Sequence, residues 1–372
     1  MLAFVRTPSS GRVGLLFAGL ALFIAGAYAR PASDAADKPD IAVKPSRPTP
    51  RARPVPTYNV QAGLDGEIFP VFANYASLQR PGERRWATVS VTIRNSSDKP
   101  LRNRITVEVP GWSDQEIQIA DVPAGAVRTY YFAPTFLPRL YRNREIAAAT
   151  VRVRVTGMGG EELYSSTVPV RLRSAQDMYW GPDFQYAQFV AAWVTPHNAN
   201  VESVLSRAKE FLPGRRLPGY EEGKNEALQA RATIAQVRAI YRALQERGVS
   251  YVKSSFTLGA HRQWTERVRP PRESLRQNSA NCIDGALMYA SLFENLGMDS
   301  IVVLVPGHAY VGVRLAPGSE RFLYLETAYT GRASFEAATA AAARSLAHHP
   351  ASDRIEVRID RARQVGIYPM PE

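Results

Sequence analysis

The chain has 372 residues, of which 45% are hydrophobic and 22% are charged, a composition that excludes an intrinsically disordered protein. Its formal net charge is +12, and nucleic acid is one conventional partner of a protein this basic. The positive charges are mainly single arginines spread along the chain, without a basic aromatic motif or a recognition helix. We therefore expect no nucleic-acid partner. Solubility explains the charge most simply, followed by an anionic envelope polymer or a membrane surface.

Residues 1–29 have the composition of a secretory signal peptide. Arg6 and Arg12 precede an apolar run over 13–27, and the small residues Ala27 and Ala29 suit a signal peptidase. The run is shorter than the ~20 residues that span a bilayer. We expect cleavage after Ala29 and an exported bacterial protein, periplasmic or secreted. In the alternative, an uncleaved segment anchors the chain in the inner membrane, and only then is a membrane a partner.

The next segment, 30–57, is dense in proline, lysine and arginine. Such a composition cannot pack a core, so it predicts an extended linker rather than a folded element. The folded part of the protein is then expected to begin at Tyr58, at a distance from whatever holds the N-terminus.

Residues 58–173 alternate between apolar and polar side chains, as β-strands do. One such run covers Trp86–Ile93 and ends at a turn-forming Asn-Ser-Ser-Asp, and further runs follow at roughly ten-residue spacing with Pro, Gly or Asp between them. No stretch of this region has a helical period. Short strands at this spacing predict an all-β, immunoglobulin-like sandwich over 58–173.

The period of the apolar residues changes from Ala187 onward. Helices are expected at 201–212, 225–247, 282–296 and 334–349, and strands at 249–256, 300–305, 309–315, 321–328 and 354–360. Between them, Pro270 and Pro271 predict a loop over 268–275. A helix followed by consecutive strands predicts an α+β domain with an antiparallel sheet over 187–372.

Cys282 is the only cysteine in the chain, so an exported protein of this sequence forms no internal disulfide. It lies in or next to the first turn of the predicted helix 282–296. Free backbone N–H groups and a partial positive charge at a helix N-terminus stabilise a thiolate. The same N–H groups could hold an oxyanion on an attacked carbonyl. Cys282 is therefore a candidate nucleophile.

His308 and Glu326 are candidates to act with Cys282. His308 begins a predicted strand directly after Pro-Gly, and Glu326 ends the next strand. In a hairpin, the tip of one strand lies beside the base of its partner, so the carboxylate could orient the imidazole and fix its tautomer. In the alternative, Cys282 is a packed core residue, His308 is a turn residue and Glu326 is solvated.

The stretch NCIDGALMYASLFENLGMDSIVVLVPGHAYVGVRL at 281–315, followed by LYLETA at 323–328, resembles the transglutaminase-like superfamily of cysteine enzymes. It is most similar to a branch of bacterial modules, some attached to large helicase-like proteins. That branch shares a Cys-Ile/Leu-Asp helix, a Gly-His-Ala-Phe/Tyr-Val-Gly strand and a Glu-Thr strand. The resemblance covers about 191–372 and implies an α+β transglutaminase-like (papain-like) fold, with the cysteine helix packed on an antiparallel sheet.

The resemblance implies that Cys282 is the nucleophile, His308 the general base and Glu326 the orienting acid. The chain departs from the superfamily in two respects. The third member is usually Asp, which is shorter than Glu by a methylene, and the aromatic oxyanion helper upstream of the cysteine has no certain counterpart. Candidates for an oxyanion or substrate site are Gln277, Asn281, Trp264 and Thr327.

The expected function is that of an exported cysteine peptidase or amidase that acts on peptide or side-chain amides, by hydrolysis or acyl transfer. Its expected partner is a protein or peptide substrate, including one of the cell envelope. We expect no cofactor and no metal, because His197 and His261 stand alone while His348 and His349 end a helix. The alternative is an inactive transglutaminase-like fold that serves as a binding or assembly module in the cell envelope.

Overall fold

The computed structural model describes residues 55–79, 86–221, 225–253 and 262–371, which form mixed helices and sheets. The expected signal peptide, 1–29, lies outside the described residues, and so does the expected linker up to residue 54. Within the described ranges, no helix combines the length and the apolar composition that crossing a bilayer requires.

Two sheets share one hydrophobic core in the first part of the chain. The smaller has the strand order β1-β3-β6, and the larger has the order β2-β8-β7-β4-β5. Within β7, Val151, Val153 and Val155 are fully buried, while Arg152 and Arg154 between them are exposed, so the period of two separates core from solvent. The strands are β1 Thr57–Ala62, β2 Glu67–Ile68, β3 Val89–Arg94, β4 Leu101–Glu108, β5 Glu116–Val122, β6 Val127–Phe132, β7 Ala147–Gly157 and β8 Glu162–Leu172. Their relation to an immunoglobulin-like sandwich stays a prediction.

The same region contains two helices, so the expectation that it has no helical stretch is wrong. They are α1, Pro70–Leu78, and α2, Pro138–Tyr141, and each has proline at its start, where the missing N–H breaks no hydrogen bond. Phe72 and Ala73 of α1 are adjacent and both buried, and the ring of Phe72 packs edge-on against Phe189. A helix that is buried on several sides has no one-sided apolar stripe, which is why the sequence pattern did not reveal it.

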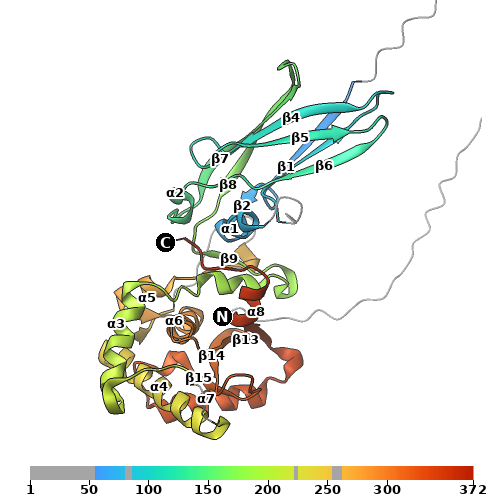
Figure 1. Cartoon of the computed structure of the whole chain (residues 1–372). Coiled ribbons are helices and arrows are strands. Elements are labelled where there is room, and N and C mark those ends of the chain that lie inside the picture. Colours follow the sequence, from blue (N-terminus) through green and yellow to red (C-terminus); the bar gives the residue numbers. More distant parts are fainter. Residues whose placement is uncertain (1–54, 80–85, 222–224, 254–261, 372) are drawn as a thin grey trace, which may run out of the picture. The chain divides into compact units, whose positions relative to one another are not determined.

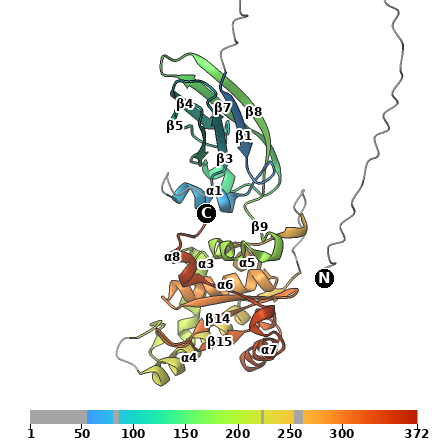
Figure 2. The same ribbon diagram turned by 90° about the vertical axis from the view of Figure 1, so that its right-hand side faces the viewer.

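The second part of the chain surrounds a four-stranded antiparallel sheet with the order β15-β14-β13-β16. Val302 and Leu304 of β13 join the large core that includes helix α6, whereas Ile301 and Val303 join a smaller core with Ala342 of helix α7. The two helices therefore cover opposite faces of the sheet (Figures 1 and 2). The elements are α6 Cys282–Asn295, α7 Phe335–His348, β13 Ser300–Val305, β14 His308–Arg314, β15 Phe322–Leu325 and β16 Ile355–Arg358.

Further helices, turns and strands complete this part. The helices are α3 Ala199–Ala208, α4 Glu226–Glu246, α5 Pro271–Gln277 and α8 Ile359–Gln364, with 3₁₀ turns η2 Pro182–Phe184, η3 Ala187–Trp193, η4 Lys209–Phe211, η5 Pro213–Arg215, η6 Arg262–Trp264, η7 Thr327–Tyr329 and η8 Ala351–Asp353. The strands are β9 Asp177–Tyr179, β10 Ser250–Tyr251, β11 Thr265–Arg267 and β12 Ser279–Ala280.

Three features of these elements differ from the expectation. The predicted loop 268–275 is wrong for most of its length, because Pro271 occupies the first position of α5, where proline favours rather than ends a helix. In addition, β9 precedes the expected boundary at Ala187, yet it pairs with β11. The expected strand 249–256 is confined to β10, and residues 254–256 lie outside the described residues.

Candidate active site

Helix α6 begins at Cys282 because a capping box fixes its first turn. Asn281 accepts a hydrogen bond from the Asp284 N–H at 2.8 Å, and Asp284 accepts one from the Asn281 N–H at 3.4 Å. This reciprocal pair satisfies two backbone donors that the helix itself cannot. Cys282 is thus the first helical residue, with the positive end of the helix dipole beside its half-buried thiol.

The first turn of α6 is also held from outside the helix. Asp284 is fully buried, and Arg269 donates to it both from its backbone N–H and from Nε, each at 2.8 Å. Burial raises the pKa of Asp284, and the hydrogen bonds and charge of Arg269 oppose that rise. The ion pair therefore ties the segment before α5 to the turn that carries Cys282.

His308 is presented by the tight turn between β13 and β14. Gly307 in this turn has a φ of 73°, a backbone conformation that glycine adopts without strain. His308 follows as the first residue of β14, and Leu325 of β15 pairs with Val311 of β14. Antiparallel pairing consequently brings the end of β15 to the start of β14.

Glu326 completes this arrangement. Its Oε2 lies 2.6 Å from Nε2 of His308, and its Oε1 accepts a hydrogen bond from the Ala328 N–H at 3.0 Å, which caps η7. The carboxylate is almost fully buried. Both oxygens therefore have fixed partners, and the orientation of the imidazole is fixed with them.

Cys282 and His308 interact directly. Burial acts to lower the pKa of His308, but hydrogen bonds with Cys282 and Glu326, together with their negative charges, outweigh it and raise the pKa to about 10. Since Glu326 occupies Nε2, the remaining ring nitrogen, Nδ1, is the one left for the sulfur. At neutral pH the imidazole is thus held in its protonated form between a thiol group and a carboxylate.

Thr327 holds the cysteine end of α6 against η7. Its hydroxyl donates to the Cys282 carbonyl at 3.3 Å. A Cβ at Gly285 would lie 2.6 Å from Thr327 Oγ1 and 3.0 Å from Thr327 Cβ, so the approach of η7 to α6 depends on a glycine at that position. Thr327, the residue that follows Glu326, is therefore a positioning residue, since its hydroxyl binds the backbone of Cys282.

The other candidates from the sequence have different surroundings. Asn281 caps α6, which occupies its side-chain oxygen. The side-chain oxygen of Gln277 accepts a hydrogen bond from Arg269 at 2.8 Å. Trp264 is 37% exposed, and its carbonyl accepts the Trp180 N–H. Among the described residues, the partners of Gln277 and Trp264 are thus Arg269 and Trp180.

Tyr251 is a site residue that the sequence analysis missed. Strand β10 runs parallel to β12, with Tyr251 opposite Ala280, and the Val252 N–H donates to the Ala280 carbonyl. Burial raises the pKa of Tyr251, and so do the negative charges of Cys282 and Glu326. A phenol that interacts with both groups is a candidate oxyanion donor, but its only sequence signal was its place in a short predicted strand upstream of the cysteine.

Glu266 is a second site residue without a sequence signal. Burial, reinforced by the charge of Asp284, raises the pKa of Glu266 to about 7, and a hydrogen bond with Trp180 opposes the rise. Its charge also acts on Tyr251. Glu266 therefore adds a carboxyl group, partly protonated at neutral pH, to the surroundings of Asp284 and Tyr251.

The arrangement as a whole has the parts that acyl transfer needs: a thiol at a helix N-terminus, an imidazole, an orienting carboxylate and a nearby phenol. Within the described residues, no group of three or more His, Cys, Asp and Glu side chains is placed to hold a metal ion. No protein-family model matches the chain, and a search of curated proteins finds no significant match.

Proposed function

We propose that the protein is an exported, transglutaminase-like cysteine enzyme that transfers or hydrolyses acyl groups of peptide or side-chain amides. The observation that supports this most strongly is the 2.6 Å contact between His308 and the buried carboxylate of Glu326, next to Cys282, which also raises the pKa of His308. A packed structural cysteine has no need of an imidazole that is itself fixed by a buried carboxylate.

In the proposed mechanism, the sulfur of Cys282 attacks the amide carbonyl carbon as a thiolate. The N–H groups of the first turn of α6 and the Tyr251 hydroxyl stabilise the resulting oxyanion. His308 then gives its proton to the leaving amine as the C–N bond breaks, which leaves a thioester on Cys282 and a neutral imidazole. Glu326 holds the tautomer throughout.

The second half of the reaction regenerates the enzyme. Neutral His308 accepts a proton from water or from an amine as that nucleophile attacks the thioester, and Cys282 leaves as a thiolate. Water gives hydrolysis and an amine gives cross-linking. Both outcomes use the same three side chains.

A test that needs no natural substrate uses p-nitrophenyl acetate. Attack by Cys282 should release one nitrophenolate per protein in a burst and leave an acetyl thioester, which intact mass detects. We expect no thioester in Cys282→Ala and a burst rate about a thousandfold lower in His308→Ala. His348→Ala is the matched control, because His348 is an exposed histidine at the end of α7.

Added glycinamide then separates the two outcomes. Acetylglycinamide as the product would show acyl transfer, and acetate alone would show hydrolysis. A wild-type protein that is acylated no faster than His308→Ala would contradict the proposal, and would favour the alternative of a transglutaminase-like fold used for binding.

A further inference from the structure

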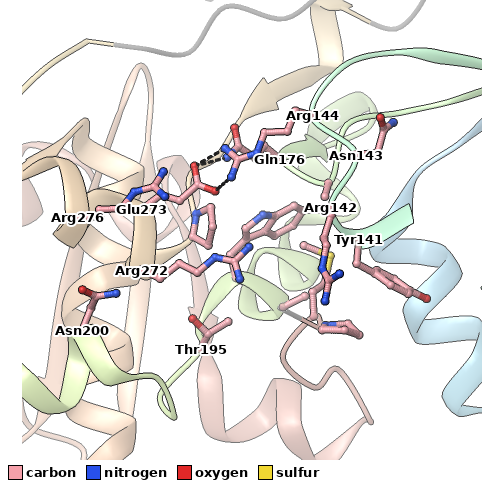
Figure 3. A pocket seen from close by; sticks show the side chains of 16 residues that line it. Tyr141, Arg142, Asn143, Arg144, Gln176, Thr195, Asn200, Arg272, Glu273 and Arg276 are labelled. Atoms are coloured by element: carbon pink, nitrogen blue, oxygen red, sulfur yellow. Dashed lines mark hydrogen bonds and ion pairs between the residues drawn. The ribbon is translucent and has the colours of Figure 1, made fainter. Parts of the chain in front are cut away.

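A cavity of about 410 Å³ lies outside the Cys282 site, within the size range of small-molecule sites. Its walls come from residues 141–144 at the end of α2 and just beyond it, from the end of η3, from α5 and from residues 370–371. Figure 3 shows how arginine side chains from two of these segments surround it. Cys282, His308 and Glu326 are not among its lining residues.

The lining of the cavity carries more positive than negative charge. Four arginines line the cavity, at 142, 144, 272 and 276, against the single carboxylate of Glu273. That carboxylate is already committed, because Arg144 donates to it at 2.8 Å and Gln176 donates to it at 2.7 Å. Among the described residues, neither Arg142 nor Arg276 has an ion-pair partner, so the cavity keeps an unneutralised positive charge.

Two buried polar groups in the same cavity lack partners. Trp193 is 1% exposed and Thr195 is 6% exposed. The indole Nε1 of Trp193 and the hydroxyl of Thr195 have no hydrogen-bond partner among the described residues. Leaving a buried donor unsatisfied is unfavourable, and an indole N–H can only donate, so an acceptor that reaches these groups from the cavity would offset that cost.

We propose that this cavity, the arginine pocket, binds a small organic anion through a carboxylate or phosphate group. Arg142 and Arg276 are exposed, and their positive charge attracts the anion. Each guanidinium group can also donate two parallel hydrogen bonds to two oxygens of the anion. Trp193 and Thr195 supply the buried hydrogen bonds. Pro270, Met370 and the indole face add an apolar lining for the body of the ligand, which a bare inorganic ion would leave uncovered.

The arginine pocket does not depend on the proposed catalysis, so an experiment can reject either proposal without rejecting the other. The probes are butyrate, acetate and inorganic phosphate, each titrated calorimetrically into the whole protein with sodium chloride adjusted to constant ionic strength. We expect saturable binding, and butyrate to bind more tightly than acetate because its chain reaches the apolar lining. Binding of phosphate alone would identify the head group as a phosphate, and binding of the carboxylates alone would identify it as a carboxylate.

The variants test the assignment of the residues. Arg142→Gln and Arg276→Gln should each weaken binding about tenfold, since each removes one charged donor. Trp193→Phe should also weaken it, and the thermal midpoint of the free protein checks that this buried substitution still folds. Arg94→Gln is the control, because Arg94 is exposed but does not line the pocket. Absence of saturable binding by all three probes, or equal weakening in Arg94→Gln, would overturn the proposal.

Discussion

Buried polar groups have hydrogen-bond partners at the start of α6, whereas two of those in the arginine pocket lack them among the described residues. At α6, Glu326 and Asp284 are each held by donors from the chain itself. In the pocket, Trp193 Nε1 and Thr195 Oγ1 have no such partner among the described residues. The first arrangement fixes its side chains in advance, as the proposed catalysis requires. The second leaves donors for a ligand to complete.

The largest effect on the rate of nitrophenolate release should come from removing the imidazole of His308. His308→Ala removes the proton acceptor and donor of Cys282, so nitrophenolate release should fall by about 10³-fold. Glu326→Gln keeps the shape but loses the charge, and should retain more activity than His308→Ala because it acts only through the imidazole. Equal losses in the two variants would contradict this order of roles.

A large effect on stability should come from Arg269. Arg269→Met leaves the fully buried Asp284 without its charged partner, which should cost ~3 kcal/mol of unfolding free energy at neutral pH. Because a buried, unpaired Asp has a raised pKa, the folded variant takes up a proton more readily than the unfolded chain, and the loss should shrink as the pH falls. Chemical denaturation at several pH values measures this.

The matched control for Arg269→Met is Arg207→Met. Arg207 pairs with Glu246, but both side chains are at least one-third exposed, and such pairs contribute less than ~1 kcal/mol. A similar loss in both variants would show that Asp284 is not held in the way the structure indicates.

A smaller effect should follow from Gly285→Ala. The new methyl group would push Thr327 away from α6 and move the adjacent Glu326, and a shift of this kind should slow nitrophenolate release about tenfold. Gly159→Ala is the control, since its methyl would approach only the end of the Glu161 side chain. An unchanged rate in Gly285→Ala would remove Thr327 from the positioning role.

The smallest effect should come from the pocket when no ligand is present. Arg142→Gln combined with Arg276→Gln removes two exposed charges that have no ion-pair partner among the described residues, so the unfolding free energy should change by less than ~0.5 kcal/mol. Thermal unfolding measures this. A large destabilisation would mean that these arginines support the fold rather than a ligand.

Local patterns explain why parts of the candidate active site could be predicted from the sequence. The start of α6 at Cys282, the strand at His308 and the end of the next strand at Glu326 depend on neighbours within a few residues: a cap, a Pro-Gly turn and a regular period. The approach of His308 to Glu326 then follows from antiparallel pairing of adjacent strands.

Long-range pairing explains what the sequence could not reveal. Tyr251 reaches the site because β10 pairs with β12, almost thirty residues later in the chain. The helical start at Pro271 was mistaken for a loop, since proline is compatible with both. The arginine pocket combines residues near 142, 193 and 276, and no local pattern connects segments so far apart.

The most direct test of the central claim is the rate at which iodoacetamide alkylates Cys282 as the pH is varied. The pKa of His308 is raised to about 10, above the ~6.5 of a free histidine, so the imidazolium that favours the thiolate persists through neutral pH and is lost as the pH rises toward 10. We predict an almost constant rate between about pH 6.5 and 8.5 in the wild-type protein. His308→Ala should instead show the roughly fiftyfold rise of an ordinary thiol over that range. Identical profiles for the two proteins would contradict the account.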